Sequence, residues 1–592
     1  MYRSRWLVLI IGGLGACIGP AGTARALEPP PDLPRYDLAI RIDPAQHNVH
    51  VSERVTWTNR HERPALELVF NVYPHFRMAP DDALLLGKTV ELLRQHPGTT
   101  VDTKGRAGEV SQVTLEEPNP TGMNPAARPT LATYYQQKID TALVVPLPTP
   151  VQKGESVTVA LEYTLNLPNK QGRWGYWEDV VFLTHWLPTL AVYDETGWQP
   201  TPFIPWHQPF FLEAGVYSAH VTLPADQKLA CSGPIGETKP GENGWQTIEI
   251  EPCTLRDFAV FCSNRFQEFT GQAGAVTIRT FALPEHAHYA EEMIKIAQDA
   301  LPAYSRWFGE YPYKHFTIVE SFFPWNGNEQ GALVMIDHRV FQMPHLGRGY
   351  VDYLLSHEIL HQWWYGVVGT NGYAETFMDE APATYFSHRL LNAEHGKNNA
   401  MLDWPRGLKW LPNIHRENYR FYARAGSIRR GEQVPAVQTM DQFGNIVSLF
   451  NGAYDRGSKI MGMIEDRLGE AATFDFFRHI YRKYYFRILR VSDFQRELTE
   501  YTGKPWDDLF QNWVYGKGLT DWKIEKVTIN PTFSHDAPAE RGSPHKTVTV
   551  LLHQKAQLDE TTVLGIAFGN GDNYGIRIPV IPQVDKLEME EP

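Results

Sequence analysis

The chain has 592 residues, which is too many for one hydrophobic core and indicates about three or four domains. Hydrophobic residues make up 43% of the sequence and charged residues 21%, the profile of a folded globular protein. The formal net charge is −13 and no basic tract occurs, so we expect no nucleic-acid partner.

Residues 1–26 are typical of a signal peptide. Two arginines precede the apolar residues 6–16, a stretch too short to span a bilayer. Cleavage after Ala24-Arg25-Ala26 would release the remainder, whereas Leu14-Gly15-Ala16-Cys17 resembles a bacterial lipobox that would leave a lipid on Cys17. Either way we expect an exported protein, periplasmic or extracellular, with a membrane as partner only through that lipid.

Residues 27–267 are predicted to form an N-terminal antiparallel β domain. Apolar and polar side chains alternate in four stretches separated by turn residues: 36–42, 49–57, 157–163 and 217–223. A helical period occurs only at 81–95, and we expect the Pro-, Gly- and Thr-rich segment 97–129 to form loops. After cleavage at residue 26 three cysteines remain, Cys231, Cys253 and Cys262, which allows one disulfide and a spare thiol.

Residues 268–520 are predicted to form an α+β domain, because a few strands are followed by many helices. The predicted strands are residues 276–281, 316–320 and 331–336, and the predicted helices are 284–308, 350–365, 381–391, 456–468, 472–486 and 492–502. Strand periodicity returns at 523–529, 547–552 and 563–568, so residues 521–592 are predicted to form a small C-terminal β domain.

The sequence His357-Glu358-Ile359-Leu360-His361 lies in an apolar, helix-forming stretch. Two histidines four residues apart lie on one face of a helix, where both imidazoles can bind one metal ion. The alternative is a helix with two histidines satisfied by other partners, but burying them beside a carboxylate is costly without a metal.

Glu380 follows His361 by 19 residues, a spacing that suits a third ligand on a second helix. Two His and one Glu, with a fourth position open for water, is the composition of a catalytic zinc site. We therefore predict one Zn²⁺ per chain. Zinc would make its bound water more acidic, with Glu358 as the general base, and such a site hydrolyses amides.

Residues 356–385 resemble the zinc signature of the aminopeptidase N-like zinc metallopeptidases, the gluzincin family that includes leukotriene-A hydrolase. Asp379-Glu380-Ala381 stands where that family usually has Asn-Glu-Gly. The resemblance implies His357, His361 and Glu380 as ligands and Glu358 as base. It also implies a multidomain α+β fold, with an N-terminal antiparallel β saddle domain, a thermolysin-like catalytic domain and the small C-terminal β domain.

Two further motifs of that family have counterparts. Asn326-Gly327-Asn328-Glu329-Gln330 stands where the family has Gly-x-Met-Glu-Asn, with Asn328 and Gln330 at the Met and Asn positions and only Glu329 clearly kept. The resemblance implies that Glu329, with Gln330 beside it, binds the free α-amino group of a peptide. Tyr454-Asp455-Arg456-Gly457 resembles the family's Tyr-x-Lys-Gly motif, so the Tyr454 phenol is expected to donate a hydrogen bond to the developing oxyanion.

The predicted function is an exported zinc aminopeptidase that acts on peptides. The family usually adds a Gln or Glu from its β domain beside the substrate amine, but here residues 182–188 offer only His185. This departure, with the altered motif at Glu329, leaves a zinc endopeptidase or a hydrolase of altered substrate range as the alternative. A catalytically inactive binding scaffold is the third interpretation.

Overall fold

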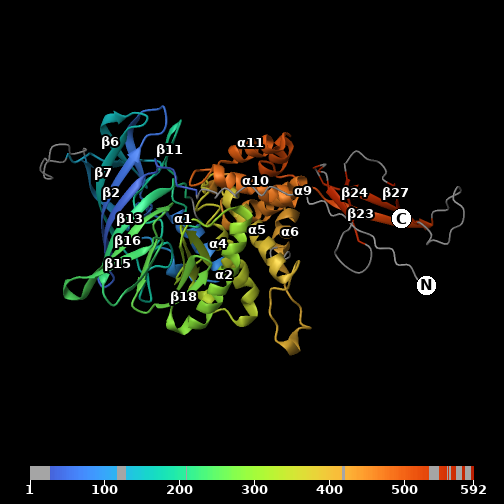
Figure 1. The fold of residues 1–592 in the computed structure, drawn as a ribbon, viewed down its shortest axis with the longest axis horizontal. Helices are drawn as coiled ribbons and strands as arrows, with labels where there is room; N and C mark the ends of the chain where they lie inside the picture. The colour runs from blue at the N-terminus through green and yellow to red at the C-terminus, as the bar shows by residue number, and fades with distance from the viewer. Residues whose placement is uncertain are drawn as a thin grey trace, which may run out of the picture.

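The computed structural model describes residues 27–116, 129–207, 210–416, 421–531, 546–556, 558, 560, 562–567, 576–580 and 588–591. The predicted leader, with Cys17, lies outside these residues. Three parts follow one another along the chain: a β-rich part, a part that combines a sheet with many helices, and a small β part at the far end (Figure 1). This order agrees with the order predicted from the sequence.

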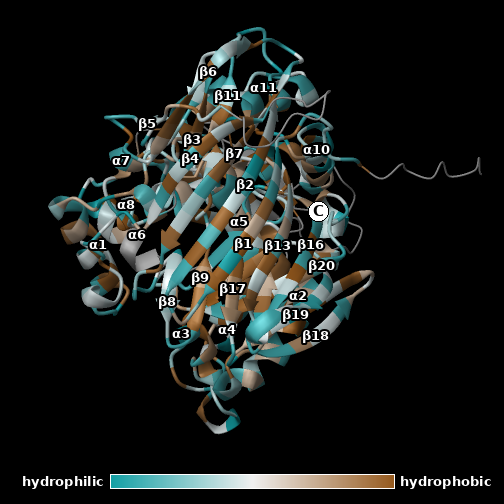
Figure 2. Cartoon of the chain, turned by 90° about the vertical axis from the view of Figure 1, so that its left-hand side faces the viewer, coloured by the Kyte–Doolittle hydropathy of each residue, from teal (hydrophilic) through white to brown (hydrophobic). Residues whose placement is uncertain are grey.

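The β-rich part is built on a seven-stranded sheet with strand order β15-β16-β13-β1-β2-β7-β4. Its strands are β1 (Arg35–Asp43), β2 (Asn48–Thr58), β4 (Gly108–Glu116), β7 (Ser156–Asn166), β13 (Gly215–Pro224), β15 (Ile235–Pro240) and β16 (Trp245–Leu255). Buried and exposed residues alternate along β2, and Figure 2 shows the same banding of hydrophobic and hydrophilic residues along the sheet. All neighbours pair antiparallel except β1 and β13, which run parallel.

Two four-stranded sheets and a hairpin complete this part, with orders β10-β3-β6-β5, β14-β17-β9-β8 and β11-β12. Their strands are β3 (Ala65–Asn71), β5 (Tyr134–Tyr135), β6 (Ala142–Val151), β8 (Trp174–Trp177), β9 (Val180–Leu183), β10 (Thr189–Leu190), β11 (Val192–Asp194), β12 (Gly197–Gln199), β14 (Lys228–Cys231) and β17 (Val260–Ser263). The predicted helix is present as α1 (Pro80–Leu92).

One prediction for this part is wrong, and one possibility that the sequence left open is not realised. The segment expected to form loops contains β4, an edge strand whose pattern the sequence hides because a bulge between Val110 and Gln112 shifts its register and most of its side chains are partly exposed. The allowed disulfide is also absent: Cys231, Cys253 and Cys262 are all buried free thiols. Burial raises the pKa of each of these thiols to about 12, so they are unreactive at neutral pH.

The central part contains a five-stranded sheet with order β18-β19-β20-β22-β21. Its strands are β18 (Gln267–Ala273), β19 (Val276–Ala282), β20 (His315–Ser321), β21 (Gly327–Gln330) and β22 (Leu333–Asp337). The helices are α2 (Ala287–Phe308), α3 (His338–Phe341), α4 (Arg348–Leu360), α5 (Phe377–His395), α6 (Phe421–Arg429), α7 (Met440–Phe443), α8 (Ile446–Leu449), α9 (Gly457–Leu468), α10 (Glu470–Lys483), α11 (Val491–Thr502) and α12 (Asp507–Leu509). Helix α4 packs against both α2 and α5.

The C-terminal part consists of a sheet with order β23-β24-β27 and a separate hairpin of β25 and β26. The strands are β23 (Trp522–Pro531), β24 (Lys546–Gln554), β25 (Thr562–Ile566), β26 (Ile576–Val580) and β27 (Glu588–Glu591). Glu560 ties this part to the central helices, since it accepts hydrogen bonds from Arg467 at 2.5 Å and from Trp513 at 2.9 Å. Across the described residues, no helix is long and apolar enough to cross a membrane.

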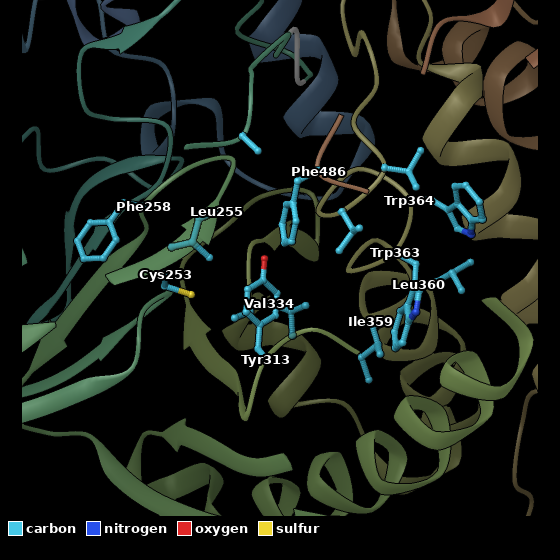
Figure 3. Packing of buried hydrophobic residues seen from close by; sticks show 14 of the residues in the cluster. Cys253, Leu255, Phe258, Tyr313, Val334, Ile359, Leu360, Trp363, Trp364 and Phe486 are labelled. Carbon is cyan, nitrogen blue, oxygen red and sulfur yellow. The ribbon is translucent and has the colours of Figure 1, made fainter. Parts of the chain in front are cut away.

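One hydrophobic cluster runs from the β-rich part into the central part. Figure 3 shows Leu255 and Phe258 at one end of this packing, Tyr313 and Val334 in the middle, and Trp363 at the other end. Because both parts share one buried core, the β-rich part is packed firmly against the central part.

Arg256, which follows β16, joins three segments of the chain at this boundary and is 1% exposed. Its guanidinium donates to the main-chain carbonyls of Tyr365 at 2.5 Å, Leu212 at 2.9 Å, and Val367 and Arg487 at 3.0 Å each. A Cβ atom on Gly369 would lie 2.2 Å from the guanidinium carbon, so this close approach requires glycine. The buried charge is thus stabilised by carbonyl dipoles.

Replacing Arg256 with Met should lower the free energy of unfolding by about 3 kcal/mol or more, because each buried carbonyl that loses its donor costs about 1–3 kcal/mol. The matched control is Arg54→Met, which removes a half-exposed arginine that pairs with Asp37 and Glu116 and should change stability by at most about 1 kcal/mol. Denaturant midpoints of the two variants give the comparison. Equal midpoints would show that Arg256 does not hold the boundary together.

Candidate metal centre

Helix α4 carries both histidines of the motif near its C-terminal end. All ten residues from Val351 to Leu360 are buried, and His361 is the residue that caps the helix. The helix ends earlier than the predicted 350–365, because Tyr365 has a φ of 106° and the chain folds back so that Trp364 pairs with Val368. This turn brings the Trp364 carbonyl to 3.1 Å from His361 Nδ1.

The contact with Trp364 decides which nitrogen of His361 is available to a metal. A carbonyl can only accept, so Nδ1 carries the hydrogen and Nε2 keeps its lone pair. A metal-binding histidine usually has its other ring nitrogen held in this way. The fold of the segment after the helix therefore orients His361 as a ligand.

Glu380, on α5, completes a triangle of ligand atoms. Its Oε2 lies 3.2 Å from His357 Nε2 and 3.4 Å from His361 Nε2, and the two Nε2 atoms are 3.3 Å apart. Ligand atoms around a tetrahedral zinc ion at about 2.0–2.1 Å are separated by about 3.3–3.4 Å. The three side chains thus fit a zinc ion in both donor chemistry and spacing.

The charges at this site also favour a cation. Glu329, Glu358 and Glu380 are all at most 6% exposed, and oxygens of Glu329 and Glu358 lie within 4.8 Å of a nitrogen of His361. Burial opposes ionisation of His361, but Glu329 and Glu380 outweigh it and raise the pKa of His361. Burial likewise opposes ionisation of Glu380, yet the two histidines lower its pKa. Burial, reinforced by repulsion from Glu329, raises the pKa of Glu358.

Glu358 lies against strand β21. A Cβ atom on Gly327 would lie 2.5 Å from Glu358 Oε1, so this first residue of the strand leaves room for the carboxylate. Gln362, which directly follows His361, joins the end of helix α4 to this strand. It donates to the carbonyl of Gln330 and accepts from the amide of Ala332, both at 2.8 Å. Glu358 and Glu329 are therefore held side by side.

Glu329 is in β21, a separate strand that runs antiparallel to β22, and does not open the single strand predicted over 331–336. Its carboxylate accepts a hydrogen bond at 2.9 Å from Asn328 Nδ2 and faces the cavity above the metal site. Gln330 is 1% exposed, and its amide donates to Asn328 Oδ1 at 2.6 Å. Gln330 does not line the cavity and instead orients Asn328.

Tyr454 reaches the site from a π-helical segment, Phe450–Arg456, that precedes α9. Its hydroxyl donates to Glu380 Oε1 at 2.5 Å. Arg456 holds this segment in place, because its guanidinium donates to the carbonyls of Trp513 and Gly518, each at 2.9 Å. The predicted helix therefore begins one turn earlier as a wider π-helix, a form that is frequent at functional sites.

A cavity of about 210 Å³ connects these groups. Glu329, Glu358, Tyr454 and all three candidate ligands line it. Two residues of the β-rich part that were not predicted as site residues, Arg173 and His207, also line it. His185 lies elsewhere, stacked on Phe210 and within 2.9 Å of the Tyr365 hydroxyl. No pattern in the sequence marks Arg173 or His207, because both come from irregular segments brought here by the packing of the two parts.

Comparisons with known proteins agree with this geometry. Residues 292–513 match the Peptidase family M1 domain. Glutamyl aminopeptidase of Bitis rhinoceros is 20% identical over 328 residues, which cover 53% of this chain and 33% of that protein. Probable aminopeptidase 2 of Sulfurisphaera tokodaii is 23% identical over 322 residues, covering 53% of this chain and 39% of that protein. The chain thus spans about a third of the length of the curated relatives it matches.

The structure resembles a solved M1 zinc metallopeptidase from Deinococcus radiodurans, with a TM-score of 0.52 and 17% sequence identity, over 82% of this chain and 94% of that one. The fold class predicted from the sequence is confirmed by this likeness. The resemblance carried by the motifs is confirmed as well: the chain contains a peptidase family M1 domain, at residues 292–513, on the fold of the M1 zinc metallopeptidases.

Proposed function

We propose that the protein is an exported zinc aminopeptidase, which hydrolyses the first peptide bond of peptides with a free N-terminus. The observation that carries the proposal is the shared cavity, in which a zinc-type ligand triangle, a buried carboxylate beside it and a second buried carboxylate face one space. The names of the relatives, glutamyl aminopeptidase and probable aminopeptidase, support the same reaction.

His357, His361 and Glu380 would hold the zinc ion. When bound, zinc supplies Lewis acidity, which polarises a substrate carbonyl and makes water more acidic. Glu358 takes the proton from the attacking water and delivers it to the leaving amine. Burial raises the pKa of Glu358, which makes it a stronger base than an exposed carboxylate.

Glu329 binds the α-ammonium group of the substrate. It is 4% exposed and accepts from Asn328, so it presents a fixed negative charge at one end of the cavity. A charge-assisted hydrogen bond to an ammonium is stronger than a neutral one and is lost when the amine is acylated. This anchor places the first peptide bond, and no later one, beside Glu358.

Tyr454 stabilises the oxyanion that forms as the carbonyl is attacked. Its single hydroxyl hydrogen is donated to Glu380 in the structure, so the contact of 3.1 Å between its oxygen and His207 requires His207 Nε2 to be the donor. Donation to the oxyanion would replace the bond to Glu380. A hydrogen bond received by the phenol oxygen makes the phenol a stronger donor. His207 is thus a positioning residue for Tyr454.

The alternative is a zinc endopeptidase. One observation favours it. Apart from Glu358 and the ligand Glu380, Glu329 is the only carboxylate that lines the described cavity, so a single carboxylate is left to bind the α-ammonium group that an aminopeptidase recognises. The inactive scaffold is disfavoured because the ligands and the base lie together in the cavity.

The test of the proposal is hydrolysis of aminoacyl-anilides with free and with N-acetylated α-amino groups. The free substrates should be cleaved, and the acetylated ones at least about 100-fold more slowly, because Glu329 then lacks its ionic partner. Glu358→Gln should lower kcat by about 10²–10⁴-fold while the protein still binds one zinc ion, measured by metal analysis. Chelation should abolish the wild-type activity.

Glu470→Gln, which changes a carboxylate on the surface of the central part, is the control for Glu358→Gln and should retain wild-type kinetics. Equal cleavage of free and acetylated substrates, or cleavage within a blocked peptide, would favour the endopeptidase instead. A protein that binds no zinc would contradict both.

A matched pair of variants tests the role of His207. His207→Phe removes the donor to Tyr454 and should lower kcat by about tenfold, with little change in KM, since oxyanion stabilisation acts in the transition state. His207→Gln keeps an N–H donor and should recover most of that loss. Tyr454→Phe should make the His207→Phe substitution silent, so full additivity in the double variant would disprove the coupling.

Export is part of the proposal and rests on the sequence of residues 1–26. Mass spectrometry of the mature protein should find either an N-terminus directly after Ala26 or a lipid-modified Cys17. An uncleaved chain recovered from the cytoplasm would contradict export.

A further inference from the structure

Arg173 brings a positive charge into the cavity from the β-rich part. It immediately precedes β8, and it lines the same cavity as Glu329 and the ligand triangle. Its guanidinium carbon lies 4.8 Å from the ring centroid of Phe210 and 5.3 Å from that of Phe323. These aromatic contacts hold the planar group in place at the cavity wall.

The hydrogen-bonding capacity of Arg173 is mostly unused. NH1 donates to Asn328 Oδ1 at 2.9 Å, whereas a guanidinium has five N–H donors. Within the described ranges of the chain, Arg173 forms no ion pair with a carboxylate, unlike the other arginines near the cavity wall such as Arg339, which pairs with Asp337 at 2.5 Å. Glu329 is the nearest negative group, but Asn328 lies between the two, so a half-buried guanidinium without a direct ion pair remains, an arrangement that an anionic ligand would improve.

Burial lowers the pKa of the Arg173 guanidinium to about 10, and the negative charge of Glu329 is the largest effect that opposes this decrease. The group therefore keeps its charge at neutral pH. The charge faces a space that a ligand can enter, because Arg173 lines the cavity together with Asn328, Trp325 and Glu329.

Asn328 fixes the distance between the two charged groups. It accepts from Arg173 through Oδ1 and donates to Glu329 Oε2 through Nδ2, at 2.9 Å in each case. The negative charge that would bind an α-ammonium group and the positive charge of Arg173 are thus separated by a single amide side chain. When the N-terminal residue of a substrate places its amine at Glu329, its side chain lies close enough to contact the Arg173 guanidinium.

We propose that Arg173 determines substrate choice by binding a carboxylate side chain on the N-terminal residue, so that the preferred substrates begin with glutamate or aspartate. A guanidinium binds a carboxylate through two parallel N–H···O bonds, which discriminates against the isosteric amide of glutamine. The proposal rests on the proposed aminopeptidase function and adds the substrate class of the same site.

The experiment compares kcat/KM for glutamyl-, glutaminyl- and leucyl-anilides with the zinc-loaded wild type and with Arg173→Met. The wild type should prefer glutamyl- over glutaminyl-anilide, and Arg173→Met should lower the glutamyl value by about 30-fold or more, since truncating one member of a buried charge pair costs about 2 kcal/mol or more. The leucyl value should change by less than about threefold. Arg173→Lys, which keeps the charge but loses the paired donors, should retain part of the preference.

The C-terminal carboxylate of a short peptide is a second source of the same chemistry. Leucyl-alanine and its C-terminal amide separate the two sources, because anilides have no such carboxylate. If Arg173→Met impairs only the free dipeptide, the proposal is overturned. It is also overturned if all three anilides lose activity equally, since Arg173 would then act only by orienting Asn328 and Glu329.

A binding measurement separates this proposal from the proposed function. Titration calorimetry with free glutamate and free glutamine, on zinc-loaded protein, should give tighter binding of glutamate to the wild type and equal binding to Arg173→Met. If no anilide is cleaved but this difference is present, the aminopeptidase function fails and the carboxylate site stands. Cleavage of leucyl-anilide with no glutamate preference in either assay overturns the carboxylate site alone.

Discussion

Three carboxylates and two imidazoles share one buried space at the C-terminal end of helix α4, and the surrounding structure is built to keep them there. Charges of one sign at such distances repel one another strongly when water is excluded. A divalent cation between His357, His361 and Glu380 relieves this repulsion and fits the observed spacing of the ligand atoms. Metal binding and the stability of the site are therefore coupled.

The groups around this site are held by main-chain contacts as much as by side-chain packing. Arg256 fixes the turn that follows helix α4. This turn orients His361 through the Trp364 carbonyl. Arg456 does the same for the π-helical segment that carries Tyr454. Each arginine is buried among carbonyl oxygens, and its N–H groups hydrogen-bond to loops that have little regular structure of their own.

The β-rich part contributes side chains to the cavity as well as to the fold. His207 reaches the hydroxyl of Tyr454, and Arg173 reaches the side chain that orients Glu329. Because a continuous hydrophobic cluster joins the two parts, these contacts do not depend on a flexible linker (Figure 3). Side chains from the two parts thus meet in one cavity.

The sequence by itself determined which three side chains form the ligand triangle of the structure and the order of the three parts, and it predicted Glu358 as the base. A motif on one helix fixes its own geometry, since residues four apart lie on one face, and periodicity distinguishes strands from helices over long stretches. The sequence did not reveal β4, whose bulge breaks the alternation, or the free state of the three thiols, which depends on strand placement. Only the tertiary structure brought Arg173 and His207 to the site and placed His185 elsewhere, because contacts between residues over 150 positions apart leave no local pattern. Gln330 bonds instead to its near neighbour Asn328 and does not line the cavity.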